Sequence, residues 1–384
     1  MLRKAGNFLR YLFGILMMLA GAGYWKEEKA YALSLLLLGI FLLPVTWNTI
    51  KKRFHVAKAL PVLLPVLLLV SACVVAGIWG LRSGAVTLET SQVFAALMGD
   101  APRSMTMVVT EWRLPRVLMA LLIGAALGVS GAIFQSLMRN PLGSPDVMGF
   151  NTGAWSGVLV AMVLFGQDLT AIALSAMVGG IVTSLLVWLL AWRNGIDTFR
   201  LIIIGIGVRA MLVAFNTWLL LKASLETALT AGLWNAGSLN GLTWAKTSPS
   251  APIIILMLIA AALLVRRMRL LEMGDDTACA LGVSVERSRL LMMLVAVVLT
   301  AAATALAGPI SFIALVAPHI ARRISGTARW GLTQAALCGA LLLLAADLCA
   351  QQLFMPYQLP VGVVTVSLGG IYLIVLLIQE SRKK

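Results

Sequence analysis

The chain has 384 residues, of which 60% are hydrophobic and only 12% are charged. A soluble domain carries about 25% charged residues, so this composition excludes a soluble enzyme, a disordered chain and a secreted disulfide scaffold. The net charge of +15 does not indicate nucleic-acid binding, because the basic residues form short clusters at the ends of apolar runs. These features predict an all-α polytopic membrane protein.

Two apolar runs open the sequence, at residues 8–23 and 31–50, with basic residues on their outer flanks. They predict a helical hairpin with both ends in the cytoplasm, in an extra N-terminal segment that covers residues 1–58. An alternative remains open. A basic start, a short apolar run and the small residues 20–22 also resemble a signal peptide with its cleavage site.

Ten further apolar segments follow from residue 59 and predict a second domain, residues 59–384, with about ten core transmembrane helices. They are residues 60–80, 114–138, 147–166, 169–192, 201–221, 251–268, 290–307, 309–324, 331–353 and 360–378. The later segments are interrupted by Gly308-Pro309 and by Pro318. Such breaks are tolerated in a membrane only where neighbouring protein or a cavity satisfies the backbone.

The basic residues predict the orientation of these helices. Residues 59–384 contain 21 Lys and Arg; fourteen lie at cytoplasmic positions, six outside and one within a span if the first of the ten segments runs outward. Both termini are then cytoplasmic, the largest outer loops are 81–112 and 222–250, and the largest inner loop is 266–289. Gly124, Gly128 and Gly131 further predict close helix packing in the second segment.

Motifs for covalent chemistry are missing from the sequence. Gly205–Ala210 fits the GxGxxA form of a dinucleotide fingerprint, but it lies in an apolar run without a βαβ unit. There is no phosphate-binding GxxxxGK[ST] loop, no Ser/His/Asp set and no His pair with metal-ligand spacing. The four cysteines form no CxxC pair, and we interpret them as small apolar residues. We therefore expect no enzymatic activity, no cofactor and no metal site.

Arg209 is the most unusual residue of the apolar segments. It lies nine residues into segment 201–221, about 14 Å from the Arg200 end, where an arginine costs about 2.5–3.5 kcal/mol. Asn216 shares its helical face, and Gly205 lies one turn before it. This polar stripe predicts a pathway lining that attracts an anionic solute. The alternative is a structural arginine that pairs with a backbone carbonyl or with Asp347.

Asp347 and His319 are the other ionisable groups within apolar segments. Together they would suit a proton relay, as in a proton-coupled secondary transporter. A structural interpretation is available for each: His319 follows Pro318 near a basic helix end, and Asp347 can pair at a helix contact.

The inner loop 266–289 has the pattern of two short helices separated by a glycine. Asp275 and Asp276 can cap a short helix over residues 277–281, which Gly282 would end, and Ser284 can begin the next. Such a compact cytoplasmic knob fits a groove on a partner protein. The alternative is a solvated loop.

Arg113 and Arg116 stand together at the outer mouth of the second segment. An arginine at an interface can hold a partner's carboxylate in a bidentate fork. The alternative role is an ordinary anchor at the membrane surface.

Four sequence blocks resemble the iron-siderophore permeases of the binding-protein-dependent ABC importers. They are RLPRVLMALLIGAALGVSGAIFQSLMRNPLGSPDVMGFNTGA at 113–154, ACALG at 278–282, GPISFIALVAPHIAR at 308–322 and LPVGVVTVSLGG at 359–370. The resemblance covers about residues 60–380. It implies ten helices, a homologous second permease subunit, a pair of cytosolic ATPase subunits and a periplasmic siderophore-binding protein.

The resemblance also implies roles for individual residues. Arg113 and Arg116 match arginines that dock the binding protein, while a third docking position holds Gln351 here. The stretch Asp276, Thr277, Ala278, Leu281 and Gly282 matches the helix that couples to the ATPase. The helices 201–221 and 360–378 match the pathway lining, which assigns Arg209, Asn216, Gly205, Thr365 and Gly369 to the substrate pathway.

The function implied by the resemblance is import of an anionic ferric siderophore, with ferric enterobactin as the expected solute. The chain would be a non-catalytic subunit of the bacterial inner membrane, and the partner ATPase would hydrolyse ATP. Two alternatives stay open: an importer of cobalamin or haem from the same family, and a proton-coupled secondary transporter that uses Asp347 and His319.

Overall fold

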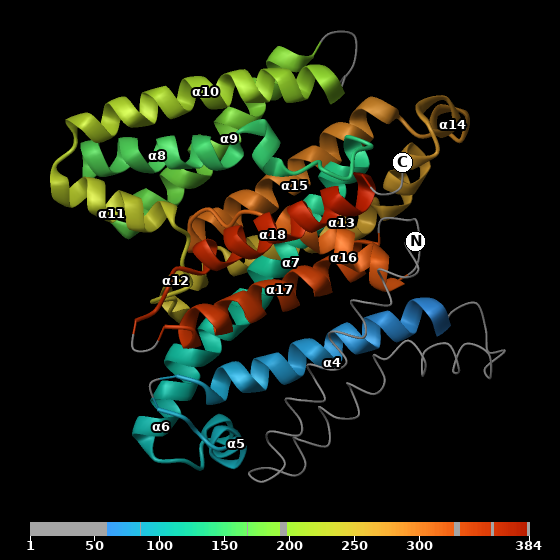
Figure 1. Ribbon diagram of the computed structural model, residues 1–384. Coiled ribbons are helices and arrows are strands. Elements are labelled where there is room, and N and C mark those ends of the chain that lie inside the picture. The colour runs from blue at the N-terminus through green and yellow to red at the C-terminus, as the bar shows by residue number, and fades with distance from the viewer. Residues whose placement is uncertain are drawn as a thin grey trace. The chain divides into compact units, whose positions relative to one another are not determined.

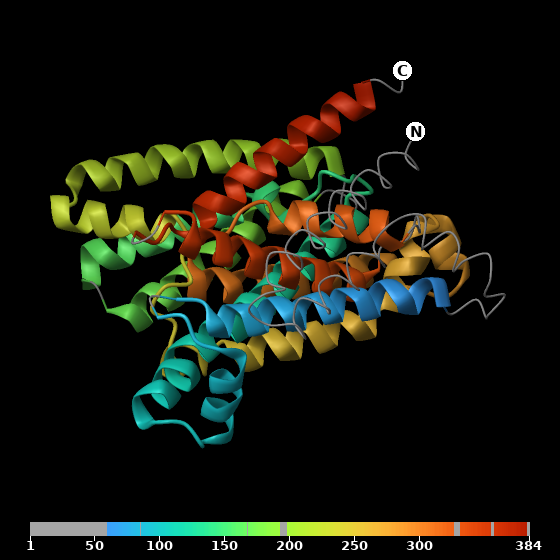
Figure 2. The same cartoon turned by 60° about the horizontal axis from the view of Figure 1, so that its bottom comes forward.

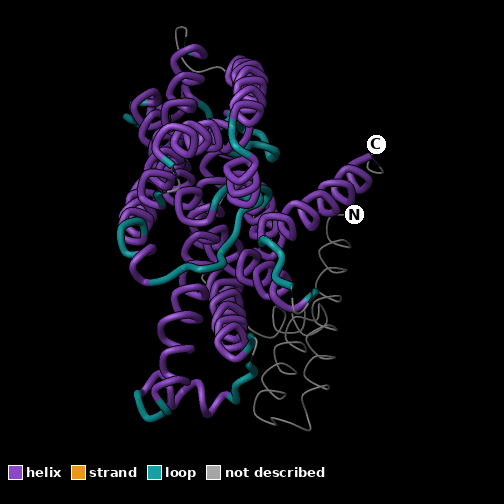
Figure 3. The backbone as a smooth tube through the Cα atoms, turned by 90° about the vertical axis from the view of Figure 1, so that its left-hand side faces the viewer, coloured by secondary structure: helices purple, strands orange, loops and turns teal. Residues whose placement is uncertain are grey.

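The structure is a computed structural model that describes residues 60–84, 86–166, 168–192, 198–325, 331–354 and 357–381. These residues form helices joined by loops (Figures 1 and 3). The predicted N-terminal hairpin and the alternative cleavage site at residues 20–22 lie outside them. The chain divides into two compact units, one of residues 1–68, 323–326 and 377–384 and the other of residues 69–322 and 327–376. The second unit holds the helical core and every candidate site residue.

Each of the ten apolar segments predicted after residue 59 coincides with a helix. The helices are α4 (Leu60–Arg82), α7 (Leu114–Leu137), α8 (Phe150–Phe165), α9 (Leu169–Ala191), α10 (Thr198–Lys222), α13 (Ala251–Glu272), α15 (Val285–Ala307), α16 (Ile313–Ser325), α17 (Leu332–Gln352) and α18 (Val361–Ser381). Seven candidate spans among the described residues are long and apolar enough to cross a membrane. The apolar stretches Phe150–Phe165 of α8 and Val361–Val375 of α18 are shorter than these seven spans. α16 is also short, with 13 residues.

The two predicted outer loops contain short helices that the apolar pattern did not indicate. The first holds α5 (Thr90–Met98), α6 (Arg103–Met107) and a π-helical turn (Val108–Arg113) that runs directly into α7. The second holds α11 (Leu225–Asn235) and α12 (Trp244–Thr247). Local capping explains two of them: Glu89 and Gln92 form a capping box on α5, and the Ser224 side chain accepts a hydrogen bond from Thr227 N. Figure 2 shows α5 and α6 side by side next to the start of α7.

The core is built on α7, which is buried along most of its length. Gly124 and Gly128 face the backbone of α17, where any side-chain carbon would collide with the carbonyl oxygens of Gly339 and Ala335. Gly131 faces the carbonyl oxygen of Ala314 on α16 in the same way. The predicted close packing through small residues is confirmed, and it explains why these positions exclude larger side chains.

The predicted break between α15 and α16 is also present. Gly308 has φ +70° and Phe312 has φ +71°, so the chain leaves the helix for five residues. Neighbouring backbone satisfies this irregular stretch, because Ser238 N donates to Ala307 O at 2.7 Å. The loop between α11 and α12 thus supports the break, as a membrane interior requires.

Candidate functional site

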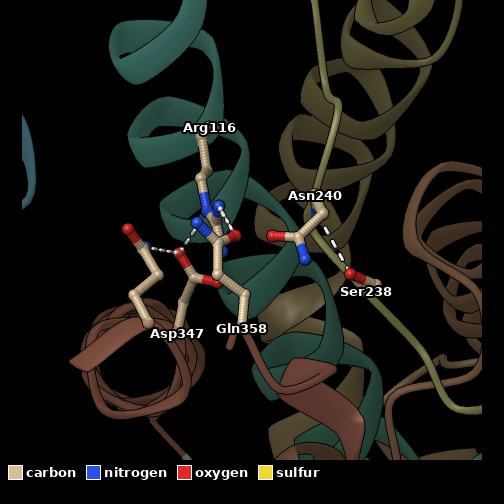
Figure 4. Close-up of polar contacts among 6 residues, drawn as sticks. Arg116, Ser238, Asn240, Asp347 and Gln358 are labelled. Carbon is tan, nitrogen blue, oxygen red and sulfur yellow. Dashed lines mark hydrogen bonds and ion pairs between the residues drawn. The ribbon is translucent and has the colours of Figure 1, made fainter. Parts of the chain in front are cut away.

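The N-terminal end of α7 carries an ion-pair cluster centred on Arg116 and Asp347 (Figure 4). Arg116 Nε and Nη2 donate to Asp347 Oδ2 and Oδ1, both at 2.8 Å, and the two side chains are 15% and 2% exposed. Gln351 Nε2 donates to the same carboxylate at 2.7 Å, and Arg116 Nη1 donates to Gln358 Oε1 at 3.4 Å. The cluster therefore joins α7, α17 and the loop before α18.

Arg113 is also held within the chain. Its Nη1 donates to the carbonyl oxygens of Leu81 and Arg82 at 2.8 and 3.0 Å, and its Nη2 donates to that of Val86 at 2.5 Å. Both guanidinium groups thus have intramolecular partners in this conformation. Docking of a binding protein through Arg113, Arg116 and Gln351 stays a prediction, in which a carboxylate of the partner either adds to these contacts or replaces one of them.

The cluster corrects one alternative drawn from the sequence. Asp347 pairs with Arg116, so the suggested structural pairing of Asp347 with Arg209 is wrong. His319 lies elsewhere: its Nε2 is 2.7 Å from the carbonyl oxygen of Pro141, which follows the inner end of α7. Arg116 and Pro141 are 25 residues apart, about 30 Å or more along this helix. Asp347 and His319 are therefore too far apart for direct proton transfer.

The Arg116–Asp347 pair gives a stability prediction. Asp347→Ala is expected to lower the free energy of unfolding by about 3–5 kcal/mol, because it leaves the Arg116 charge buried without its carboxylate. Thermal unfolding of the detergent-solubilised protein measures this. The matched control is Arg116→Met with Asp347→Leu, which removes both charges and is expected to recover most of the loss. Equal unfolding temperatures for wild type and Asp347→Ala would show that the pair contributes little.

A cavity of about 560 Å³ lies between α8, α10, the end of α11, the irregular segment before α16 and the start of α18. Arg209 and Asn216 of α10 are in its wall, as predicted. Among the described residues, no carboxylate forms an ion pair with Arg209 and no group accepts a hydrogen bond from it. The guanidinium charge is thus available to a solute. Further polar and aromatic lining comes from Asn151, Trp155, Asn235, Ser311 and Ser367.

Three of the predicted pathway residues are not in the wall of this cavity, as far as the chain is described. Gly205 is buried. Thr365 is also buried and donates to the carbonyl oxygen of Gly362 at 3.0 Å, and Gly369 lies against the ring of Phe312. The predicted helix α18 does line the cavity, but through Gly362, Val363, Val366 and Ser367. The assignment of Gly205, Thr365 and Gly369 to the substrate pathway stays a prediction.

The α8 side of the cavity was not expected. Trp155 lies in the wall and stacks on Trp234, with ring centroids 6.0 Å apart and planes at 9°. Asn151 and Thr152 belong to the same wall, and all three residues sit in or next to the block 113–154 that carried the resemblance. The only other signal in α8 is the group of polar residues Asn151, Thr152 and Ser156 in its first two turns, in a helix that is otherwise apolar.

An acidic residue lies behind this wall. Asp146, in the short 3-10 helix Pro145–Met148, accepts a hydrogen bond from Asn151. Burial raises the pKa of Asp146 to about 6, and the positive charge of Arg209 opposes that rise. Gly149, three residues after Asp146, is close to Arg209, since a side-chain carbon at Gly149 would lie 3.5 Å from Arg209 Cβ. The field in the cavity thus reflects Arg209 together with a weakly acidic carboxyl.

The inner loop forms the predicted knob. α14 (Asp275–Ala280) is anchored by Asp275, which pairs with Arg139 at 2.7 Å and with Arg289 at 2.9 Å. Ala278 faces inward, whereas Asp276, Thr277 and Leu281 are exposed. Gly282 has φ +81° and ends the turn, and Ser284 is the N-cap of α15, as predicted. The N-cap of α14 is Gly274 rather than an aspartate, so Asp275 and Asp276 occupy the first turn.

Among the described residues, no three or more His, Cys, Asp or Glu side chains lie together where they could hold a metal ion. Cys73 and Cys338 are buried, in line with their interpretation as apolar residues. Cys279 and Cys349 are exposed, so that interpretation is wrong for these two. Cys279 lies in α14 of the knob, and Cys349 lies near the C-terminal end of α17.

Comparison with known proteins agrees with this architecture. The sequence pattern of the FecCD transport family matches residues 70–379. The chain is 99% identical over 322 residues to the ferric enterobactin transport system permease protein FepG of Escherichia coli K12, covering 84% of this chain and 98% of FepG. It is 37% identical over 279 residues to the hemin transport system permease protein HmuU of Yersinia pestis, covering 71% and 83%. A solved metal-chelate type ABC transporter in an inward-facing conformation superposes with a TM-score of 0.70 at 25% identity, covering 82% of this chain and 98% of that one.

Proposed function

The chain belongs to the FecCD transport family, and we propose that it is the permease subunit of an ABC importer that carries ferric enterobactin from the periplasm to the cytoplasm. The observation that carries this proposal is the 99% identity to FepG over almost all of FepG. The cavity supports it independently. A ferric tris-catecholate is a polyanion, and the Arg209 charge in the cavity wall can offset part of the hydration that it loses on entry.

The proposed machine has further subunits. A homologous second permease completes the pore, two cytosolic ATPase subunits supply the energy, and a periplasmic protein delivers the siderophore. The chain itself then catalyses no reaction; it alternates between outward and inward access as the ATPases close and open. We place it in the bacterial inner membrane with both termini in the cytoplasm, on the asymmetry of its basic residues.

Three regions of the chain have separate roles in this proposal. Arg113, Arg116 and Gln351 form the outer docking face, where a carboxylate of the binding protein would compete with the internal partners. Arg209 and Asn216 line the pathway. The knob presents Asp276, Thr277, Leu281 and Gly282 to the ATPase, and the exposed Leu281 side chain supplies an apolar contact.

The direct test is uptake of labelled ferric enterobactin by cells that lack only this chain. Uptake is expected to be lost and to return when the chain is expressed from a plasmid. Labelled haemin and cobalamin are measured in parallel, because HmuU is a hemin permease of the same family. Ferric enterobactin uptake that persists without the chain, or a defect confined to haemin or cobalamin, would refute the proposal.

The N-terminal segment gives a further prediction. Residues 1–58 lie outside the part matched by the family, which begins at residue 70. Deleting residues 2–57 is expected to leave ferric enterobactin uptake within about twofold of wild type, since the packed core and every site residue lie beyond them. The amount of protein in the membrane is measured alongside. Loss of assembly in a truncated chain that still inserts would make residues 1–58 part of the transporter.

A further inference from the structure

The cavity wall contains a second polar side chain, Asn216, which has no role in attracting an anion. Asn216 is 4% exposed and lies in the wall, on the same face of α10 as Arg209. Its Nδ2 donates to the carbonyl oxygen of Thr152 on α8, at 3.4 Å. Its Oδ1 has no hydrogen-bond partner among the described residues.

The contact with Thr152 fixes which end of the amide is unpaired. A backbone carbonyl accepts hydrogen bonds and cannot donate them, so the group that faces Thr152 must be the NH₂. The oxygen is therefore the group without a partner. A buried acceptor that stays unpaired costs about 1–3 kcal/mol, and an isolated one beside a cavity indicates a donor that arrives from elsewhere.

The separation of Arg209 and Asn216 along α10 limits which kind of solute can carry that donor. Seven residues separate Arg209 from Asn216, which is about 10 Å along the helix axis. One solute that reaches both side chains must be large, with negative charge at one end and an N–H or O–H group at the other. A large anionic chelate with amide groups around its metal-binding core fits this description, whereas a small inorganic anion does not.

We propose that Asn216 is a specificity-determining residue of the cavity, whose Oδ1 accepts a hydrogen bond from an amide N–H or a hydroxyl of the solute that Arg209 attracts. The inference rests on the proposed function and adds to it a second contact, in which Asn216 Oδ1 accepts a hydrogen bond from an uncharged donor group of the solute. Arg209 alone attracts any anion. The pair selects anions of the right length with a donor at the right place.

The test compares ferric enterobactin uptake by wild type, Asn216→Leu and Asn216→Ser. Asn216→Leu keeps the size and removes both the Oδ1 acceptor and the Nδ2 donor to Thr152. It is expected to lower Vmax/KM about tenfold, the usual effect of losing one hydrogen bond to a bound solute. Asn216→Ser keeps an acceptor oxygen and is expected to lose less. Thr217→Val is the matched control on the same helix, since the Thr217 hydroxyl already donates to the carbonyl oxygen of Val213 at 2.9 Å.

Membrane level and basal ATPase rate of the assembled complex are measured for each variant. A normal level with reduced Vmax/KM for Asn216→Leu, and a smaller change for Thr217→Val, supports the inference. Unchanged uptake by Asn216→Leu overturns it while leaving the proposed function intact. A drop in thermal stability with unchanged uptake also overturns it, since Asn216 then serves only to hold α8 and α10 together through Thr152. If wild type itself transports no ferric enterobactin, the proposed function has failed instead.

Discussion

Arg209→Ala is expected to lower ferric enterobactin uptake about tenfold or more, while membrane level and basal ATPase activity of the complex stay normal. The physical reason is electrostatic. Two unit charges about 4 Å apart interact by about 4 kcal/mol at the effective dielectric near a protein surface, so even a third of that energy corresponds to about tenfold. Arg209 lines the cavity, and no carboxylate among the described residues forms an ion pair with it. The Asp146 carboxyl, which Arg209 influences electrostatically, weakens the attraction without removing it.

Two further variants show whether uptake depends on the charge of residue 209 or on the size of its side chain. Arg209→Lys keeps a positive charge and is expected to retain more uptake than Arg209→Ala. Arg209→Glu reverses the charge and is expected to be the poorest of the three, because it repels the polyanion. Failure of all three variants to assemble would indicate a structural arginine, and normal uptake by Arg209→Ala would remove the anion pathway through this cavity.

Leu281→Asp is expected to abolish ferric enterobactin uptake almost completely, by about a hundredfold, with the permease still in the membrane. Leu281 is 58% exposed on a knob that is otherwise anchored by ion pairs, so its apolar surface needs a partner. A carboxylate there would have to be buried unpaired against the ATPase, at a cost of several kcal/mol. Uptake, ATP hydrolysis and co-purification of the ATPase are measured together. Leu281→Met is the matched control and is expected to behave as wild type.

Gly282→Val tests the same surface through the backbone. Gly282 has φ +81°, a conformation that a β-branched residue adopts only with strain of about 1–3 kcal/mol. Gly282→Asn is the control, because asparagine tolerates this region better than other non-glycine residues. Loss of coupling in the valine variant and its retention in the asparagine variant are expected. Full uptake by both Leu281→Asp and Gly282→Val would exclude the knob from energy coupling.

The helices of the core were predictable because a membrane helix is a long run of apolar residues, which is visible in the sequence. Ten apolar segments after residue 59 became ten helices, and Gly124, Gly128 and Gly131 occupy the close contacts that their spacing predicted. The knob was predictable for a local reason too, since Gly282 and Ser284 set its turns within a few residues of sequence. The short outer helices were missed because α5 and α11 depend on caps rather than on hydrophobic length.

Contacts between segments that are distant in the sequence could not be predicted from it. Arg116 and Asp347 are 231 residues apart, and nothing local shows that one pairs with the other. The cavity wall poses the same difficulty. α18 is apolar on all sides, so its sequence does not define which face turns inward, and the structure places Val363 and Val366 in the wall rather than Thr365 and Gly369. Arg209 and Asn216 were found because they interrupt an apolar helix on one face.

Reconstituted transport tests the central claim most directly. The chain, its second permease subunit and the ATPase pair are incorporated into liposomes loaded with ATP, and the binding protein delivers labelled ferric enterobactin from outside. The account predicts accumulation that requires the binding protein and hydrolysable ATP and that falls about tenfold with Arg209→Ala. Accumulation that follows an imposed proton gradient without ATP, or transport of haemin or cobalamin but not ferric enterobactin by the same complex, would contradict it.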